Sequence, residues 1–222
     1  MNKTEIKRIL GKELKPYLMD QGFNLYAAFT HIYVLNEGEK VIHFFFHFHS
    51  DGSIGLGPIS ITFYEVEDYI LNIGIPSNKL VEQKKREKDH LPTIEFRTTP
   101  AVLSNRTLRT EVEVEDYAES FISFYENDVS AFMKKYNNIP AVFNALIESE
   151  SKGKPWKELI YGMGGAFIRV LIISKLCGDP KYSEKFNKIN AIFQGSIEWQ
   201  PYWENYKIAL KEIEPKYNLD KA

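Results

Sequence analysis

The sequence has one cysteine, no long apolar run and no excess of positive charge, and each shortage excludes a class of protein. Cys177 is the single cysteine among 222 residues, so no disulfide can form within the chain, which is typical of a reducing compartment. The most apolar run covers residues 166–173, contains Arg169, and is far shorter than the ~20 residues that cross a bilayer. Since the first residues also lack the apolar stretch of a secretory signal, we expect a cytoplasmic protein with no membrane partner.

The charge balance argues against nucleic acid as a partner. The chain has 28 Lys and Arg residues against 30 Asp and Glu residues, which gives a formal net charge of −2. Proteins that hold a phosphate backbone usually carry a clear basic excess, because Lys and Arg replace the counterions of the nucleic acid. We therefore expect no nucleic-acid partner.

The motifs of common catalytic sites are missing as well. Gly162-Met163-Gly164-Gly165 is similar to the start of a dinucleotide fingerprint, but Phe167 stands where the third glycine belongs. The sequence has no Gly-Lys-Ser/Thr phosphate loop and no Gly-x-Ser-x-Gly nucleophile elbow. Cys177 is expected to follow a helix, whose partial negative charge at that end disfavours a thiolate. These absences predict no catalytic residue and no cofactor, and they favour a protein that is not an enzyme.

The first half of the chain predicts a helix followed by an antiparallel meander of about five strands. Asn2 and Glu5 have the spacing of a capping box, and apolar residues recur at helical spacing up to Leu18. Beyond Gly22 the pattern alternates, with turn signals at Asn36-Glu37-Gly38 and Asp51-Gly52. The predicted strands cover residues 23–35, 41–49, 53–64, 93–97 and 106–114.

The second half predicts helices to the end of the chain. A long amphipathic stripe runs from Tyr117 to Tyr136, Pro140 can open the next helix, and residues 156–176 form a further helix with a glycine-rich middle. We thus expect an α+β fold, with a sheet domain over residues 1–115 and a helical region over residues 116–222. The two regions pack on each other or form one continuous domain.

An acidic tract marks the start of the helical half. Residues 110–133 contain no Lys or Arg, and seven carboxylates fall among them. Carboxylates near a helix start favour the helix dipole, which is the structural interpretation. The functional interpretation is an interaction surface that meets and steers a basic protein. Its candidate residues are Glu111, Glu113, Glu115, Asp116 and Glu119.

A run of alternating histidines is the sharpest local feature. His43, His47 and His49 share one face of a predicted strand, while Phe44 and Phe46 take the other. Neutral imidazoles are good zinc ligands, so these three histidines are candidate metal ligands. His31 or Asp51 could complete such a site. The alternative is that the histidines fill the half-exposed face of an amphipathic strand.

Aromatic residues recur near the end of the chain. Trp199, Tyr202, Trp203 and Tyr206 have helical spacing. Such a stripe is typical of a core, whereas an exposed stripe would be a hot spot for protein binding.

The N-terminal segment resembles a known but uncharacterised family. Its residues Ile9-Leu10, Leu14-Lys15-Pro16-Tyr17-Leu18 and Gly22-Phe23, followed by an aromatic meander, are similar to bacterial domains that open with a helix reading Leu-Lys-Pro-x-Leu and then Gly-Phe. Small α+β proteins of this kind look like bacterial immunity and accessory proteins. The resemblance covers the first third of the chain, contains no catalytic motif and implies no activity.

Taken together, the sequence favours a non-catalytic cytoplasmic protein that binds another protein through an acidic or aromatic surface. One alternative is a metal-binding protein or metal-dependent enzyme built on His43, His47 and His49. Another is a small-ligand module with a pocket between the sheet and the helices.

Overall fold

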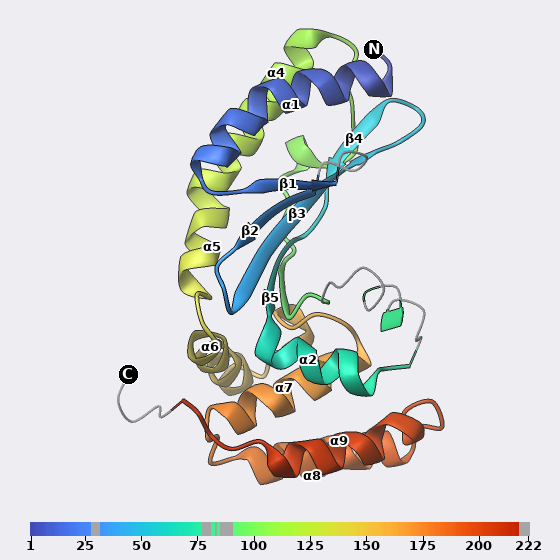
Figure 1. The fold of residues 1–222 in the computed structure, drawn as a ribbon, viewed down its shortest axis with the longest axis vertical. Helices are drawn as coiled ribbons and strands as arrows, with labels where there is room; N and C mark the ends of the chain where they lie inside the picture. The colour runs from blue at the N-terminus through green and yellow to red at the C-terminus, as the bar shows by residue number, and fades with distance from the viewer. Residues whose placement is uncertain (28–31, 77–80, 83, 85–90, 218–222) are drawn as a thin grey trace. The chain divides into compact units, whose positions relative to one another are not determined.

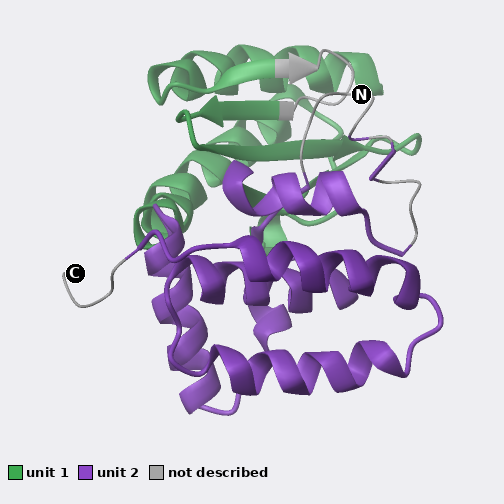
Figure 2. Cartoon of the chain, turned by 60° about the horizontal axis from the view of Figure 1, so that its bottom comes forward, with its two compact units in different colours: residues 1–61, 95–135 green, residues 62–94, 136–222 purple. Residues whose placement is uncertain are grey.

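The computed structural model describes residues 1–27, 32–76, 81–82, 84 and 91–217, and the fold is α+β as predicted (Figure 1). An N-terminal helix comes first, an antiparallel sheet follows, and the C-terminal half is helical. The chain divides into two compact units, each assembled from two segments (Figure 2). Unit 1 comprises residues 1–61 and 95–135, and unit 2 comprises residues 62–94 and 136–222.

Unit 1 begins with helix α1 (Lys3–Asp20), which starts and ends as its sequence predicts. The Asn2 side chain accepts from the backbone N–H of Glu5, and Glu5 accepts from that of Asn2, so the capping box is present. The buried residues of α1 are Ile6, Ile9, Leu10, Leu14 and Leu18. Gly22, at φ 85°, closes the helix, because the N–H of Phe23 then donates to the carbonyl of Leu18.

Strands β1 to β4 and β7 of unit 1 follow one another as hydrogen-bonded neighbours in the order β1-β2-β3-β4-β7. The predicted strand over residues 23–35 is two strands, β1 (Asn24–Ala27) and β2 (Ile32–Asn36), which pair antiparallel. The predicted strand over 53–64 is also two, because Gly57-Pro58 separates β4 (Ser53–Leu56) from β5 (Ile59–Phe63). Between β2 and β4 in sequence lies β3 (Lys40–Phe48), which pairs with β2, β4 and β5.

Two short strands complete the sheet. The strand predicted over residues 93–97 is present as β6 (Ile94–Phe96), which pairs with β5. Strand β7 (Arg106–Thr107) pairs with β4 and follows a single 3-10 turn (Ala101–Leu103). Both β5 and β6 begin in one unit and end in the other.

The strand predicted over residues 106–114 is wrong beyond Thr107. Thr110 is the N-cap of helix α4 (Glu111–Phe124), and Thr110 and Glu113 form a capping box that starts the helix there. The helix continues through a π-helical turn (Tyr125–Val129) into α5 (Ser130–Lys135). The predicted domain boundary between residues 115 and 116 therefore falls inside α4.

Helices α1 and α4 lie side by side against one face of the sheet (Figure 1). The core between them is aromatic: the ring of Phe121 on α4 lies 5.1 Å from that of Phe44 and 5.2 Å from that of Phe46 on β3. Alternate residues of β3 point the other way, so Phe45 and His47 lie on the face that α1 and α4 do not cover, and the ring of His49, directly after the strand, lies beside that of His47.

Unit 2 is built around α7 (Gly164–Leu176), a helix that is buried on nearly all sides and mostly apolar, with Arg169 as its buried charge. It contacts α2 (Tyr64–Ile73), α6 (Ile139–Ser151), α8 (Tyr182–Gln194) and α9 (Gln200–Glu212). Helix α2 follows β5 directly and was not predicted. None of the helices in the described part of the chain is long and apolar enough to cross a membrane.

The single helix predicted over residues 156–176 is wrong in its first half. A 3-10 turn (Trp156–Glu158) comes first, and the N–H of Tyr161 then donates to the carbonyl of Thr93 at 2.9 Å. Gly162, at φ 80°, turns the chain before α7 begins. The glycine run therefore lies at the helix start and not in its middle.

Candidate functional site

The acidic tract lies on α4 and the turn that follows it, and its five carboxylates on α4 have three different environments. Glu113 belongs to the cap of α4: it accepts from the backbone N–H groups of Arg109 and Thr110. These hydrogen bonds hold the pKa of the Glu113 carboxyl below its usual value. Of the five predicted interaction residues, Glu113 thus has a structural task that explains its presence.

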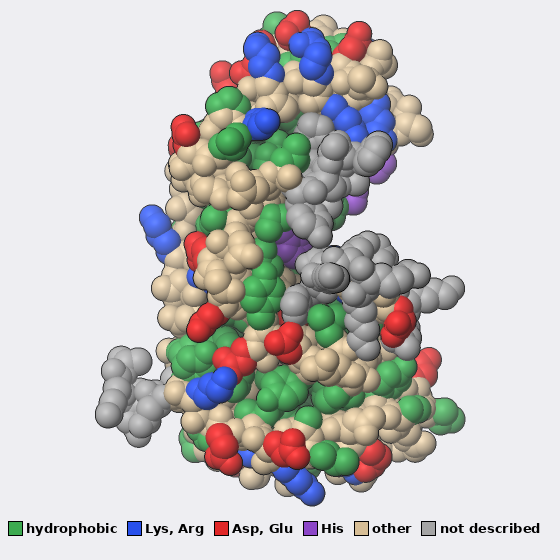
Figure 3. Space-filling model, viewed as in Figure 1, with side chains coloured by type: hydrophobic (Ala, Val, Ile, Leu, Met, Phe, Trp, Pro, Cys, Tyr) green, Lys and Arg blue, Asp and Glu red, His purple; other side chains and the backbone are tan. Residues whose placement is uncertain are grey.

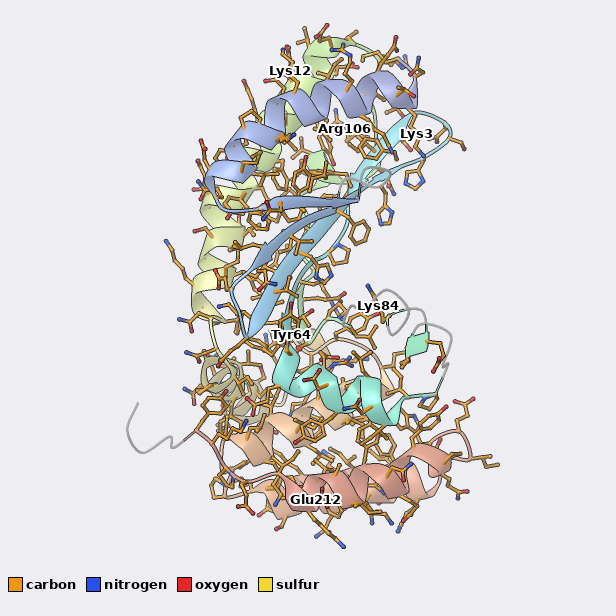
Figure 4. All side chains as sticks on the ribbon, in the orientation of Figure 1. Lys3, Lys12, Tyr64, Lys84, Arg106 and Glu212 are labelled. Carbon is orange, nitrogen blue, oxygen red and sulfur yellow. The ribbon has the colours of Figure 1, made fainter. Side chains whose placement is uncertain are left out.

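Glu111 and Glu115 lie on the side of α4 that faces α1, within reach of the charge of Lys12. The pKa of the Lys12 ammonium is raised first by its hydrogen bond with Glu13 and further by the charges of Glu13, Glu115 and Glu111. Figure 4 labels Lys12 on α1 beside α4, and Figure 3 shows further Lys and Arg side chains over α1. The charge of these two carboxylates is therefore partly balanced within unit 1.

Asp116 and Glu119 point away from the rest of unit 1. Together with Val112 and Ser123 they recur every three or four residues, directly opposite the buried stripe of α4, and all four are exposed. We call these four residues the α4 outer face. Within the part of the chain that the structure describes, no Lys or Arg forms an ion pair with Asp116 or Glu119. Val112 adds an apolar side chain that is 62% exposed.

The predicted histidine face is present on β3, but its members are not equivalent. His47 and His49 are exposed, whereas His43 is half-buried. The ring of His47 lies 4.5 Å from that of Phe45 and 6.2 Å from that of His49. Burial lowers the pKa of the His47 imidazole, and the neighbouring His49 lowers it further.

No complete metal site forms within one chain over the described residues. Among them no three His, Cys, Asp or Glu side chains come close enough together to hold an ion. Asp51 is occupied with Ser53, whose backbone N–H and hydroxyl both donate to its carboxylate, and these bonds lower the Asp51 pKa. His31 lies outside the described residues.

A buried charge cluster in unit 2 escaped the sequence analysis. The guanidinium of Arg169 on α7 donates to both carboxylate oxygens of Glu67 on α2, at 2.7 and 2.6 Å, and both side chains are 0% exposed. Thr93 donates its hydroxyl proton to Glu67 at 2.9 Å, and Arg169 also donates to the carbonyl of Tyr161 at 3.1 Å. Such completely partnered buried charges are typical of a structural pair.

The signal for this cluster was one cation in the apolar run of residues 166–173. Lys and Arg are almost never fully buried without a partner, so Arg169 required an acid elsewhere in the chain. Nothing in the local pattern identified Glu67 as that acid, 102 residues away.

The glycine run is explained by packing. A Cβ atom at Gly165 would lie 2.8 Å from the Arg169 guanidinium, and one at Gly164 would overlap the indole of Trp199. Small residues here let α7 begin against these two large side chains.

The remaining sequence candidates are parts of the core. Cys177 is buried, and burial raises the pKa of its thiol to about 12, with the charges of Asp179 and Glu65 adding to the effect. In the aromatic stripe, Trp203 and Tyr206 are buried, and Trp199 and Tyr202 are half-buried. The buried pair confirms the core interpretation for half of the stripe.

We find no match to this chain among known family models, curated proteins or solved structures. A functional assignment therefore depends on the chain's own residues. The α4 outer face and the pair His47 and His49 are two exposed features in the described part of the chain whose chemistry suits a partner or a ligand.

Proposed function

We propose that this protein is a non-catalytic binding protein whose α4 outer face holds a basic segment of another protein. The observation that carries the proposal is the pair Asp116 and Glu119, which are exposed on a helix whose opposite side is fixed in the core. Neither carboxylate has a cationic partner in the described part of the chain.

The surroundings of this pair favour binding over simple solvation. Val112 exposes an apolar side chain next to the two carboxylates, and a contact of that kind can exclude water from neighbouring ion pairs. The charge of Asp116 and Glu119 would steer a basic partner and set its orientation, which is the main contribution of complementary charge at an interface. A partner helix with Lys or Arg every three or four residues and one apolar residue would match the spacing of the α4 outer face.

The single buried cysteine and the resemblance of the N-terminal helix to those of bacterial immunity and accessory proteins agree with this proposal. The lone cysteine fits a reducing compartment, and the resemblance fits a protein that acts by holding another protein.

The proposal is tested by charge reversal with a matched control. The probe is a synthetic helical peptide with lysines at three- and four-residue spacing, and its binding is followed by fluorescence anisotropy. Asp116→Lys with Glu119→Lys changes the net charge from −2 to +2, since each reversal adds 2. Glu198→Lys with Glu212→Lys makes the same change at exposed positions of unit 2.

Comparing the two double variants shows whether peptide binding depends on the α4 outer face itself or only on the net charge of the protein. Exposed ion pairs contribute about 0.5 kcal/mol each, so losing two and adding two repulsions amounts to roughly 2 kcal/mol, or about thirtyfold in Kd. We expect that loss in the α4 variant and a much smaller one in the control. Equal weakening in both variants, or none in either, would contradict the proposal.

A further inference from the structure

Two exposed histidines, His47 near the end of β3 and His49 directly after it, form a second surface feature, separate from the α4 outer face. His47 and His49 project from the same side of the strand, and their rings lie 6.2 Å apart and nearly parallel, with an interplanar angle of 26°. Both side chains are exposed, and Figure 3 shows histidine side chains at the surface of the molecule.

The neighbouring strand leaves these imidazoles accessible. Gly55 on β4 lies opposite His47, so it places no side chain beside that ring. Ser53, whose carbonyl accepts from the backbone N–H of His49, is the small neighbour of the second ring. A bound ion or a second protein could therefore approach both rings from solvent.

The third predicted ligand is too far away to join this pair. His43 precedes His47 by four residues on the same strand, which corresponds to roughly 13 Å at 3.3 Å per residue. One chain thus supplies two imidazoles, and the described residues bring no third ligand to them. Zinc in a structural site takes four ligands in a tetrahedron, and imidazole nitrogen is among those it prefers.

We infer that His47 and His49 bind Zn²⁺ together with the same two residues of a second copy of this chain. A two-fold axis through the ion relates the copies, so each contributes an identical pair and four imidazoles complete the tetrahedron. Two-fold symmetry is the most frequent arrangement of protein dimers, and it makes the same surface serve on both sides. The copies meet at the histidine pair on the face of the sheet that α1 and α4 leave uncovered.

The inference is tested by measuring mass and metal content together on the full chain. Sedimentation velocity, with native mass spectrometry, is recorded with Zn²⁺ and again with a chelator. We expect a dimer with one zinc per two chains, which returns to monomer when the chelator is added. His47→Asn with His49→Asn should lose both the zinc and the dimer, whereas His43→Asn, the matched control on the same strand, should keep both.

Three results would overturn the inference. They are a chain that takes up no zinc, a chain that binds one zinc as a monomer, and a zinc dimer that survives in the His47→Asn, His49→Asn variant. Circular dichroism of that variant shows whether it is folded, and the two substituted side chains are exposed, so the fold should persist. Since the α4 outer face lies on another element, failure of one test leaves the other unaffected.

Discussion

The ion pair between Arg169 and Glu67 gives the sharpest stability prediction. Arg169→Met keeps most of the side-chain volume but removes the cation and its two hydrogen bonds to the Glu67 carboxylate, which stays 0% exposed and still accepts from Thr93. Breaking a buried pair in this way costs about 3–5 kcal/mol, because one charge stays buried after the opposite charge is removed. A domain is usually stable by only about 5–15 kcal/mol, so the loss is a large fraction of the total.

The double variant Glu67→Leu, Arg169→Met distinguishes the effect of the two charges on stability from the effect of the volume that their side chains fill. Replacing both charges with apolar side chains removes the uncompensated carboxylate, so the double variant should recover most of the loss. The hydroxyl of Thr93 would then lack the acceptor that Glu67 provides, which keeps the recovery incomplete.

The assay is urea unfolding followed by tryptophan fluorescence. All three tryptophans, Trp156, Trp199 and Trp203, belong to unit 2, so the signal reports the unit that contains the pair. At about 2–4 °C per kcal/mol, the single variant should also lower Tm by roughly 6–20 °C. A loss below about 1 kcal/mol for Arg169→Met, or a double variant no more stable than Arg169→Met, would refute this reasoning.

Four further predictions concern local features. Thr110→Ala should cost about 1 kcal/mol in urea unfolding because it removes the N-cap of α4. Because backbone hydrogen bonds lower the Glu113 pKa, the stabilisation from that carboxylate should be complete above the usual pKa of 4.5 and be lost as the pH falls through the lowered pKa. An NMR titration of Glu113 measures this pKa, and a midpoint at or above 4.5 would contradict the prediction. Cys177, whose pKa is raised to about 12, should react with a thiol reagent at mildly alkaline pH only after unfolding, and fast labelling of the native protein would count against its burial. Gly164→Ala should cost about 1–3 kcal/mol because its methyl overlaps an indole, whereas Gly195→Ala, whose nearest neighbour would be 3.7 Å away, should cost much less, and equal losses would exclude packing as the cause.

The sequence correctly predicted the helix ends that are determined by capping residues and by a left-handed glycine. The capping box of Asn2 and Glu5 and the left-handed Gly22 are read directly from residue types, and α1 begins and ends with them. The strand predicted over residues 106–114 was wrong beyond Thr107, because Thr110 and Glu113 cap a helix there. That capping box was visible in the sequence, and a helix explains why Val112 is exposed while Val114 is buried.

Long-range partners could not be predicted in this way. Arg169 indicated that an acid must be buried with it, but only the fold brings Glu67 on α2 against α7. The histidine alternation predicted one face correctly, yet it could not show that His43 is half-buried while His47 and His49 are exposed. Likewise, the acidic tract predicted a charged surface, but only the helix geometry shows that its carboxylates lie in three places: in the cap, on the side facing α1 and on the outer face.

The most direct test of the proposed function is an NMR titration of the labelled protein with the lysine-rich helical peptide. If the α4 outer face is the binding surface, the backbone amide shifts that change should centre on Val112, Asp116, Glu119 and Ser123, and they should diminish as salt is added. Shift changes centred on another element, or none at all, would contradict the assignment of this face as the site where the protein holds its partner.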